Sequence, residues 1–148
     1  MTTIEKVLRI ATQEKGVAEA PKGSNAGPVL KYGGKFGQPW CCRFVCWCWH
    51  EATGNWPTSA GNTGGTGTLW AAAKKDGTRV SAPQPGDIFY KARYEGGKRI
   101  GGHVGFVERV EDDGVLRTIE GNLRNAVRRT VRNPDGVIGF IRPKVREC

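Results

Sequence analysis

The chain has 148 residues, of which 25% are charged and 9% aromatic, a composition that excludes extensive disorder and suits one folded domain over 1–148. Its net charge of +9 indicates attraction to a polyanion such as nucleic acid, anionic lipid or an anionic cell wall, although charge can also serve solubility alone. No stretch approaches the roughly 20 apolar residues that span a membrane, and Met1–Lys6 is too polar for a signal peptide, so membrane insertion is not expected.

The N-terminal half of the chain predicts helices around a long loop. Residues 3–14 carry apolar side chains on one helical face and follow Thr2, a suitable capping residue. Residues 16–39 are rich in glycine, proline, serine and asparagine and predict an irregular segment. Residues 41–53 are apolar nearly all round and predict a buried helix, and residues 66–75 predict a third helix.

After Pro83 the pattern changes from helical to alternating. Strands are predicted at 87–91, 103–110, 115–121, 126–131 and 137–141. Helices that precede strands in this way indicate an α+β domain with a largely antiparallel sheet. The 22 glycines indicate many tight turns and close backbone approaches.

Four of the five cysteines lie within eight residues, Cys41 to Cys48. An odd total, with most of the cysteines in one crowded cluster, is a poor disulfide framework, so we expect reduced thiols and synthesis in a reducing compartment. Cys41 begins the predicted helix, where the partial positive charge and free N–H groups stabilise a thiolate. Zinc would require ligand pairs from a second segment, so no metal or other cofactor is expected. The role of Cys148 stays open, and three cysteines are expected to be packing residues: Cys42, Cys46 and Cys48.

Two histidines compete as the base for a Cys41 nucleophile. His50 lies in the same predicted helix, about 13 Å along its axis, which is too far to share a proton. His103 lies in an alternating strand whose glycines leave room for another element or a substrate: Gly101, Gly102 and Gly105. A cysteine and a histidine brought together from distant sequence form a thiol nucleophile and its base.

The turn at residues 111–114 places polar side chains beside His103. A two-residue loop at its centre, or a loop of all four residues, sets His103 opposite Asn122 and makes Glu120 its diagonal neighbour on the same face. A three-residue loop would reverse the face. Either residue could be an ordinary polar residue at a strand end, but a Cys–His site needs such a third member to orient the imidazole.

Gln38 precedes Cys41 by three residues and is a candidate oxyanion donor through its side-chain amide. The backbone N–H of Cys41 or Cys42 is a second candidate for this role. Gln38 can equally be an ordinary loop residue.

An ordered set of motifs resembles the CHAP family, the cysteine- and histidine-dependent amidohydrolases/peptidases related to NlpC-type and papain-like enzymes. The motifs cover nearly the whole chain: Gly23–Asn25, Pro39–Val45, Pro85–Ile88, Gly102–Gly105 and Ile119–Asn122. The resemblance implies a papain-like/NlpC-type fold with N-terminal helices packed on an antiparallel sheet. It also implies Cys41 as nucleophile, His103 as base, and Glu120 and Asn122 as orienting partners. Some members carry a calcium loop, but residues 16–40 contain no Asp and one Glu, so calcium is not expected.

The resemblance further implies hydrolysis of peptidoglycan, at the muramoyl–L-alanine amide or at a stem or cross-bridge peptide bond. With no evident signal peptide or wall-binding module, the chain resembles a phage endolysin, made in the cytoplasm and acting on the wall after release. A virion-associated lysin or a bacterial wall-remodelling enzyme also fits. We expect a monomer whose partners are peptidoglycan and, by charge, anionic wall polymers, rather than nucleic acid. The alternatives are a basic nucleic-acid-binding protein and a non-catalytic wall-binding module.

Overall fold

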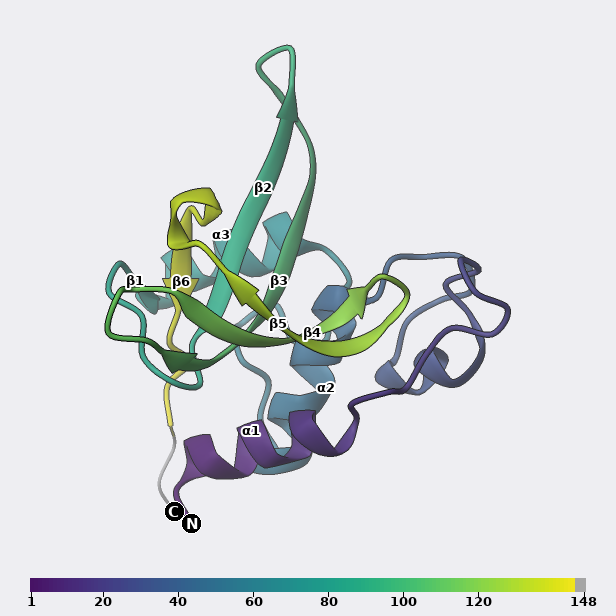
Figure 1. Ribbon diagram of the computed structural model, residues 1–148, viewed down its shortest axis with the longest axis horizontal. Helices are drawn as coiled ribbons and strands as arrows, with labels where there is room; N and C mark the ends of the chain where they lie inside the picture. Colours follow the sequence, from purple (N-terminus) through teal and green to yellow (C-terminus); the bar gives the residue numbers. More distant parts are fainter. Residues whose placement is uncertain (146–148) are drawn as a thin grey trace.

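The computed structural model describes residues 1–145, in which helices pack on one antiparallel sheet whose strands differ in length (Figure 1). The helices of this part of the chain are α1 (Thr3–Gln13), η1 (Gly27–Tyr32), α2 (Cys41–Thr53), α3 (Thr66–Asp76) and η2 (Pro134–Gly136). The strands in the same residues are β1 (Arg79–Val80), β2 (Ile88–Glu95), β3 (Lys98–Val110), β4 (Leu116–Leu123), β5 (Ala126–Arg132) and β6 (Gly139–Ile141), in the order β1-β6-β2-β3-β4-β5. The predicted α+β class is confirmed. Arg146, Glu147 and Cys148 lie outside the described residues.

The helices follow the sequence pattern closely. The Thr2 side chain accepts a hydrogen bond from the Glu5 N–H at 3.1 Å, which caps α1 as its sequence predicts. α2 has the predicted bounds, and most of its side chains are buried because apolar residues surround it on nearly every face. The 16–39 segment is irregular apart from η1. Among residues 1–145, no helix combines the length and apolarity required to cross a membrane.

The β2–β3 hairpin is longer than its sequence predicts. The two strands continue to Glu95 and from Lys98, and they turn at Gly96-Gly97, where both residues have positive φ. This turn suits the right-handed twist of the strands, which glycine pairs accommodate without strain. The hairpin projects beyond the rest of the sheet (Figure 1), so its charged residues stay solvated and gave no alternating apolar signal. The short strand β1 was also not predicted.

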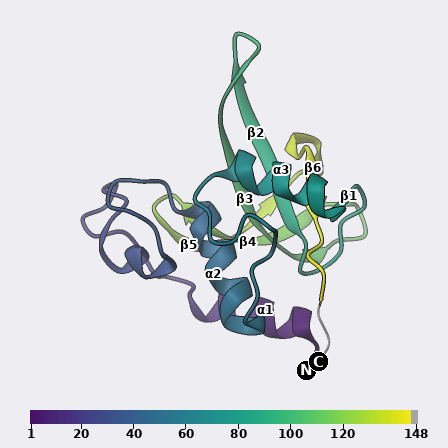
Figure 2. The same ribbon diagram turned by 180° about the vertical axis from the view of Figure 1, so that it is seen from behind.

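α2 and α3 cover one face of the sheet, as the view from behind shows (Figure 2), and α1 packs against α2. The main core joins residues of α2, such as Phe44, to sheet residues such as Phe106 and Ile119. The opposite face carries a smaller apolar cluster that includes Phe89 and Leu116. Successive residues of a strand therefore point alternately into the main core and to the opposite face. The smaller cluster lies on that opposite face, together with the polar site described below.

The loop between β3 and β4 differs from the prediction, although the predicted face is preserved. Glu111 pairs with Val115, which leaves a three-residue loop ending at Gly114 with φ +86°. Such a loop would reverse the face of His103 relative to Glu120. A bulge in β3 at Glu108 restores it, because the pairing shifts by one residue between Arg109 and Val107.

Candidate active site

Cys41 is the first residue of α2, and the residue is 6% exposed. The first helical hydrogen bond runs from the Phe44 N–H to the Trp40 carbonyl at 3.0 Å. The amide N–H groups of Cys41, Cys42 and Arg43 precede that bond and have no acceptor within the helix. The thiol therefore lies where N–H dipoles converge, which favours negative charge.

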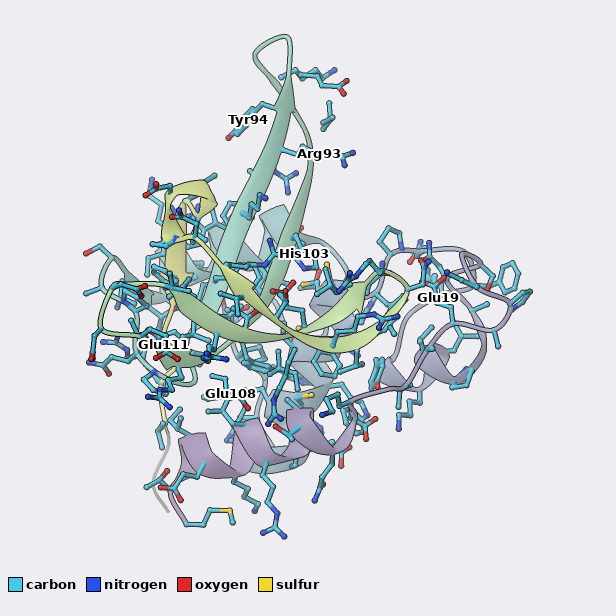
Figure 3. The ribbon with its side chains drawn as sticks, viewed as in Figure 1. Glu19, Arg93, Tyr94, His103, Glu108 and Glu111 are labelled. Carbon is cyan, nitrogen blue, oxygen red and sulfur yellow. The ribbon has the colours of Figure 1, made fainter. Side chains whose placement is uncertain are left out.

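The start of α2 is anchored to the long loop before it. The Trp40 indole N–H donates to Glu19 Oε2 at 2.8 Å, and the Asn25 N–H donates to Glu19 Oε1 at 3.0 Å. The Trp40 ring also stacks on Tyr32, with the centroids 5.6 Å apart. Glu19 is buried, and Figure 3 shows it in the loop that leads towards α2. No local pattern indicates the Glu19–Trp40 hydrogen bond, because the two residues are brought together only by the fold.

Gly121 allows α2 to approach the sheet closely. A methyl group at this position would lie 2.6 Å from Phe44 Cβ, so any larger residue would push the helix away. The β3–β4 ladder ends nearby, at the Phe106–Ile119 pair, and beyond it β3 is paired with β2. His103 lies in that stretch of β3, beside the start of α2.

His103 meets Glu120 on the face away from the main core. Its Nε2 atom lies 2.7 Å from Glu120 Oε1, and its ring packs against Phe89 with the centroids 5.8 Å apart. Figure 3 shows His103 on β3 near the middle of the sheet. A methyl group at Gly105 would lie 2.7 Å from both Glu120 Cγ and Phe89 Cε2. Glycine is therefore required there for the carboxylate to reach the imidazole.

Glu120 is fully buried, and its charge is neutralised by Arg132. The Arg132 guanidinium donates from Nε to Oε2 at 2.5 Å and from Nη2 to Oε1 at 2.6 Å, and Thr118 Oγ1 also donates to Oε2 at 2.5 Å. Arg132 comes from the end of β5, and its guanidinium lies over the Phe89 ring. Arg132 was not predicted as a site residue, although a buried glutamate requires a cation and β5 contains three arginines.

The electrostatics favour a protonated imidazole beside an ionised carboxylate. Burial acts to lower the pKa of His103, but hydrogen bonding to Cys41 and Glu120, with their negative charge, outweighs it and raises the pKa to about 9. Burial acts to raise the pKa of Glu120, but hydrogen bonds from Arg132, His103 and Thr118 hold it at about 2. Because this carboxylate is ionised at neutral pH, Nε2 donates to it. The Nδ1 atom is then left for the Cys41 thiol.

A cleft of about 470 Å³ opens beside His103 and is walled by β2, β3 and the end of β4. Asn122 lines it and adopts a left-handed backbone conformation, with φ +57°. Within residues 1–145 its side chain forms no hydrogen bond to His103, so its orienting role stays a prediction. Gln38 is exposed beside Pro39, which lines the cleft, and its role as an oxyanion donor also stays a prediction.

The remaining thiols and the second histidine lie apart from this arrangement. The three other cysteines of α2 are fully buried in the main core: Cys42, Cys46 and Cys48. His50 stacks on Trp56, with the ring centroids 4.0 Å apart. Within residues 1–145, no three His, Cys, Asp or Glu side chains are grouped so that they could hold a metal ion.

A family profile for the CHAP domain matches residues 32–122, which include Cys41, His103, Glu120 and Asn122. The chain belongs to the CHAP family. CHAP domains are cysteine- and histidine-dependent amidohydrolases and peptidases, and the helices and antiparallel sheet of this chain agree with their papain-like fold. No curated protein and no solved structure matches the chain. Arg132, which neutralises Glu120 in this CHAP domain, lies beyond the matched residues.

Proposed function

We propose that this CHAP protein is a peptidoglycan hydrolase that cleaves an amide bond of the bacterial cell wall by a thiol mechanism. The observation that carries the proposal is the connected series Cys41, His103, Glu120 and Arg132, in which a thiol at a helix start adjoins an imidazole held by a buried, neutralised carboxylate. A nucleophile, a base and an orienting group are the three members that thiol catalysis requires.

In the proposed mechanism the proton of the Cys41 thiol rests on His103 Nδ1, as the raised pKa of the imidazole favours, and the Cys41 thiolate attacks the carbonyl carbon of the scissile amide. The tetrahedral oxyanion is stabilised by the free backbone N–H groups of Cys41 and Cys42, with the Gln38 amide as a further donor. The imidazolium protonates the leaving amine as the C–N bond breaks, which leaves a thioester. His103 then deprotonates water, which attacks the thioester and releases the acid product and the free thiol.

Glu120 serves this cycle by orientation and charge. Its carboxylate accepts a hydrogen bond from Nε2–H throughout, which fixes the orientation of the ring and stabilises the imidazolium. Arg132 keeps that carboxylate in one position by two parallel hydrogen bonds. We propose that Asn122, at the cleft wall, assists the orientation of the ring or of the substrate.

The test compares two cysteine variants of the same helix. Cys41→Ala should abolish the clearing of a cell-wall suspension while the protein keeps its circular dichroism and melting temperature. Cys46→Ala, a packing position, should retain lysis. Lysis by Cys41→Ala together with inactivity of a folded Cys46→Ala would refute the assignment. Wall binding without product release, unchanged by Cys41→Ala, would instead identify a binding module.

Mass spectrometry of the released fragments identifies the bond. A new N-terminal L-alanine indicates the muramoyl–L-alanine amidase, whereas a new end at D-alanine or glycine indicates an endopeptidase of the stem or cross-bridge. Both reactions use the same thioester chemistry, because each breaks an amide C–N bond.

We further propose that the enzyme acts as a phage endolysin, attracted to anionic wall polymers by its net charge of +9. Expression inside a bacterium should cause lysis only when a membrane pore is also opened. Wall binding should weaken as the salt concentration rises from about 0.05 to 0.5 M, because exposed charges are then screened. Lysis without a pore would contradict the proposed release step.

A further inference from the structure

The cleft beside His103 carries cationic side chains and, among its described lining residues, no carboxylate. The lining cations are Lys91 and Arg93 of β2, together with Arg132. Arg132 is already committed to Glu120, through two hydrogen bonds. Lys91 and Arg93 differ, because neither has an acidic partner among residues 1–145.

The register of the β2–β3 hairpin sets these two cations in a row beside the base. Lys91 is the direct cross-strand partner of His103, and Arg93 is the partner of Gly101. Directly opposed side chains share one face of a sheet, with their Cβ atoms about 5 Å apart. Arg93 lies two residues, about 7 Å, further along the same face of β2, towards the tip of the hairpin.

The space next to Arg93 is open. A methyl group at Gly101 would meet no atom within 4 Å, so the floor of the cleft is bare backbone opposite the guanidinium. Figure 3 shows Arg93 on the hairpin above His103 and Tyr94 pointing to the other side of β2. A ligand that lies over Gly101 would thus lie beside the reacting imidazole and in a cleft lined by Lys91 and Arg93, two cations that have no acidic partner among residues 1–145.

We propose that Lys91 and Arg93 form a carboxylate-binding subsite, which selects substrates that carry a free carboxylate within about one residue of the scissile amide. Ammonium and guanidinium groups bind carboxylates by charge-assisted hydrogen bonds, which neutral amides cannot match. This inference rests on the proposed function, since it identifies the substrate class of the same cleft. Stem peptides of peptidoglycan offer such carboxylates, and conversion of these groups to carboxamides removes the charge without changing the shape.

The experiment measures binding separately from cleavage. Soluble cross-linked fragments of peptidoglycan are prepared with free carboxylates and with the same groups converted to carboxamides. Calorimetry measures their Kd for Cys41→Ala protein, which cannot turn them over. The measurement is then repeated with Cys41→Ala protein that also carries Lys91→Met and Arg93→Met. The matched control carries Lys98→Met with Arg109→Met, which removes the same two charges from exposed positions outside the cleft.

The free-acid fragments should bind about tenfold more tightly than the carboxamides, and the difference should fall below about twofold in the Lys91→Met/Arg93→Met protein but persist in the control. Equal binding of both forms, no binding of either, or a difference that survives in Lys91→Met/Arg93→Met would overturn the subsite. Cleavage by the wild type is measured in parallel. Absence of cleavage with a preserved binding difference would overturn the proposed function and leave the subsite in place.

Discussion

Replacement of Arg132 by methionine isolates the buried ion pair that supports the base. The change removes the two hydrogen bonds of 2.5 and 2.6 Å from a carboxylate that is 0% exposed, and it keeps an apolar side chain over Phe89. Removal of one partner of a buried pair costs about 3–5 kcal/mol. Glu120 keeps Thr118 and His103 as donors, so we expect a loss near the lower end, about 3 kcal/mol. For a chain of this length the melting temperature should fall by about 10 °C.

The same variant should move the titration of His103. A cation near an imidazole disfavours its protonated form, so the loss of Arg132 leaves the Glu120 charge uncompensated and raises the pKa of His103 further above about 9. A purely structural role for Arg132 would lower activity without this movement. NMR titration of the His103 ring, or the basic limb of the pH–activity profile, distinguishes the two.

Urea unfolding, followed by tryptophan fluorescence, measures the free energy of unfolding of the wild type and of each variant. The comparison requires that the denaturant slope m is the same for all of them. The control is Arg129→Met, on the same strand, whose ion pair with Glu108 is largely solvated and should contribute less than about 1 kcal/mol. The double variant Glu120→Gln/Arg132→Met should lose less than the sum of the single losses, by about 2–3 kcal/mol, because no buried charge remains unpaired. Equal, small losses for Arg132→Met and Arg129→Met, or additive losses in the double variant, would refute the reasoning.

Three further predictions concern the same site. The folded-state pKa of His103 lies above its unfolded value of about 6.5. Protonation of His103 therefore adds on the order of 3 kcal/mol to the free energy of unfolding, which is fully present below about pH 6.5 and is lost as pH rises through about 9. Urea midpoints across this range should decline for the wild type, and His103→Gln should show a flatter curve. The pKa of Glu120 is lowered instead. The stabilisation by its ionised carboxylate is therefore present above about pH 4.3, which is the pKa of this carboxyl in the unfolded chain, and is lost as pH falls towards about 2. Gly105→Ala should destabilise the protein by about 1–3 kcal/mol through overlap with Glu120, whereas Gly101→Ala, in open space, should change the melting temperature little; equal effects would contradict the packing argument.

Several parts of the site could be predicted from local patterns. The apolar run after Trp40 predicted the helix that begins at Cys41, and strand alternation put His103 and Glu120 on their strands. The shared face of the two residues was also predicted, although the loop was wrong. The three-residue loop and the bulge at Glu108 compensate for each other, and neither has a strong local signal.

Other parts depend on contacts between distant segments. Glu19 supports Trp40 across 21 positions, and Arg132 reaches Glu120 from a neighbouring strand. Neither residue stands out in the sequence, because a glutamate in a loop and an arginine in a strand are common in soluble proteins. Their roles arise from burial, which makes an unpaired charge costly and so requires a partner at that position.

The sequence by itself determined the α+β order, the helix that presents Cys41 and the residue types of a thiol site, because local periodicity and composition encode them. Only the tertiary structure decided how the site is charged. Packing buries Glu120, brings Arg132 to it and leaves Lys91 and Arg93 without acidic partners among the described residues beside the cleft. These outcomes depend on desolvation and on register between strands, which no single segment contains.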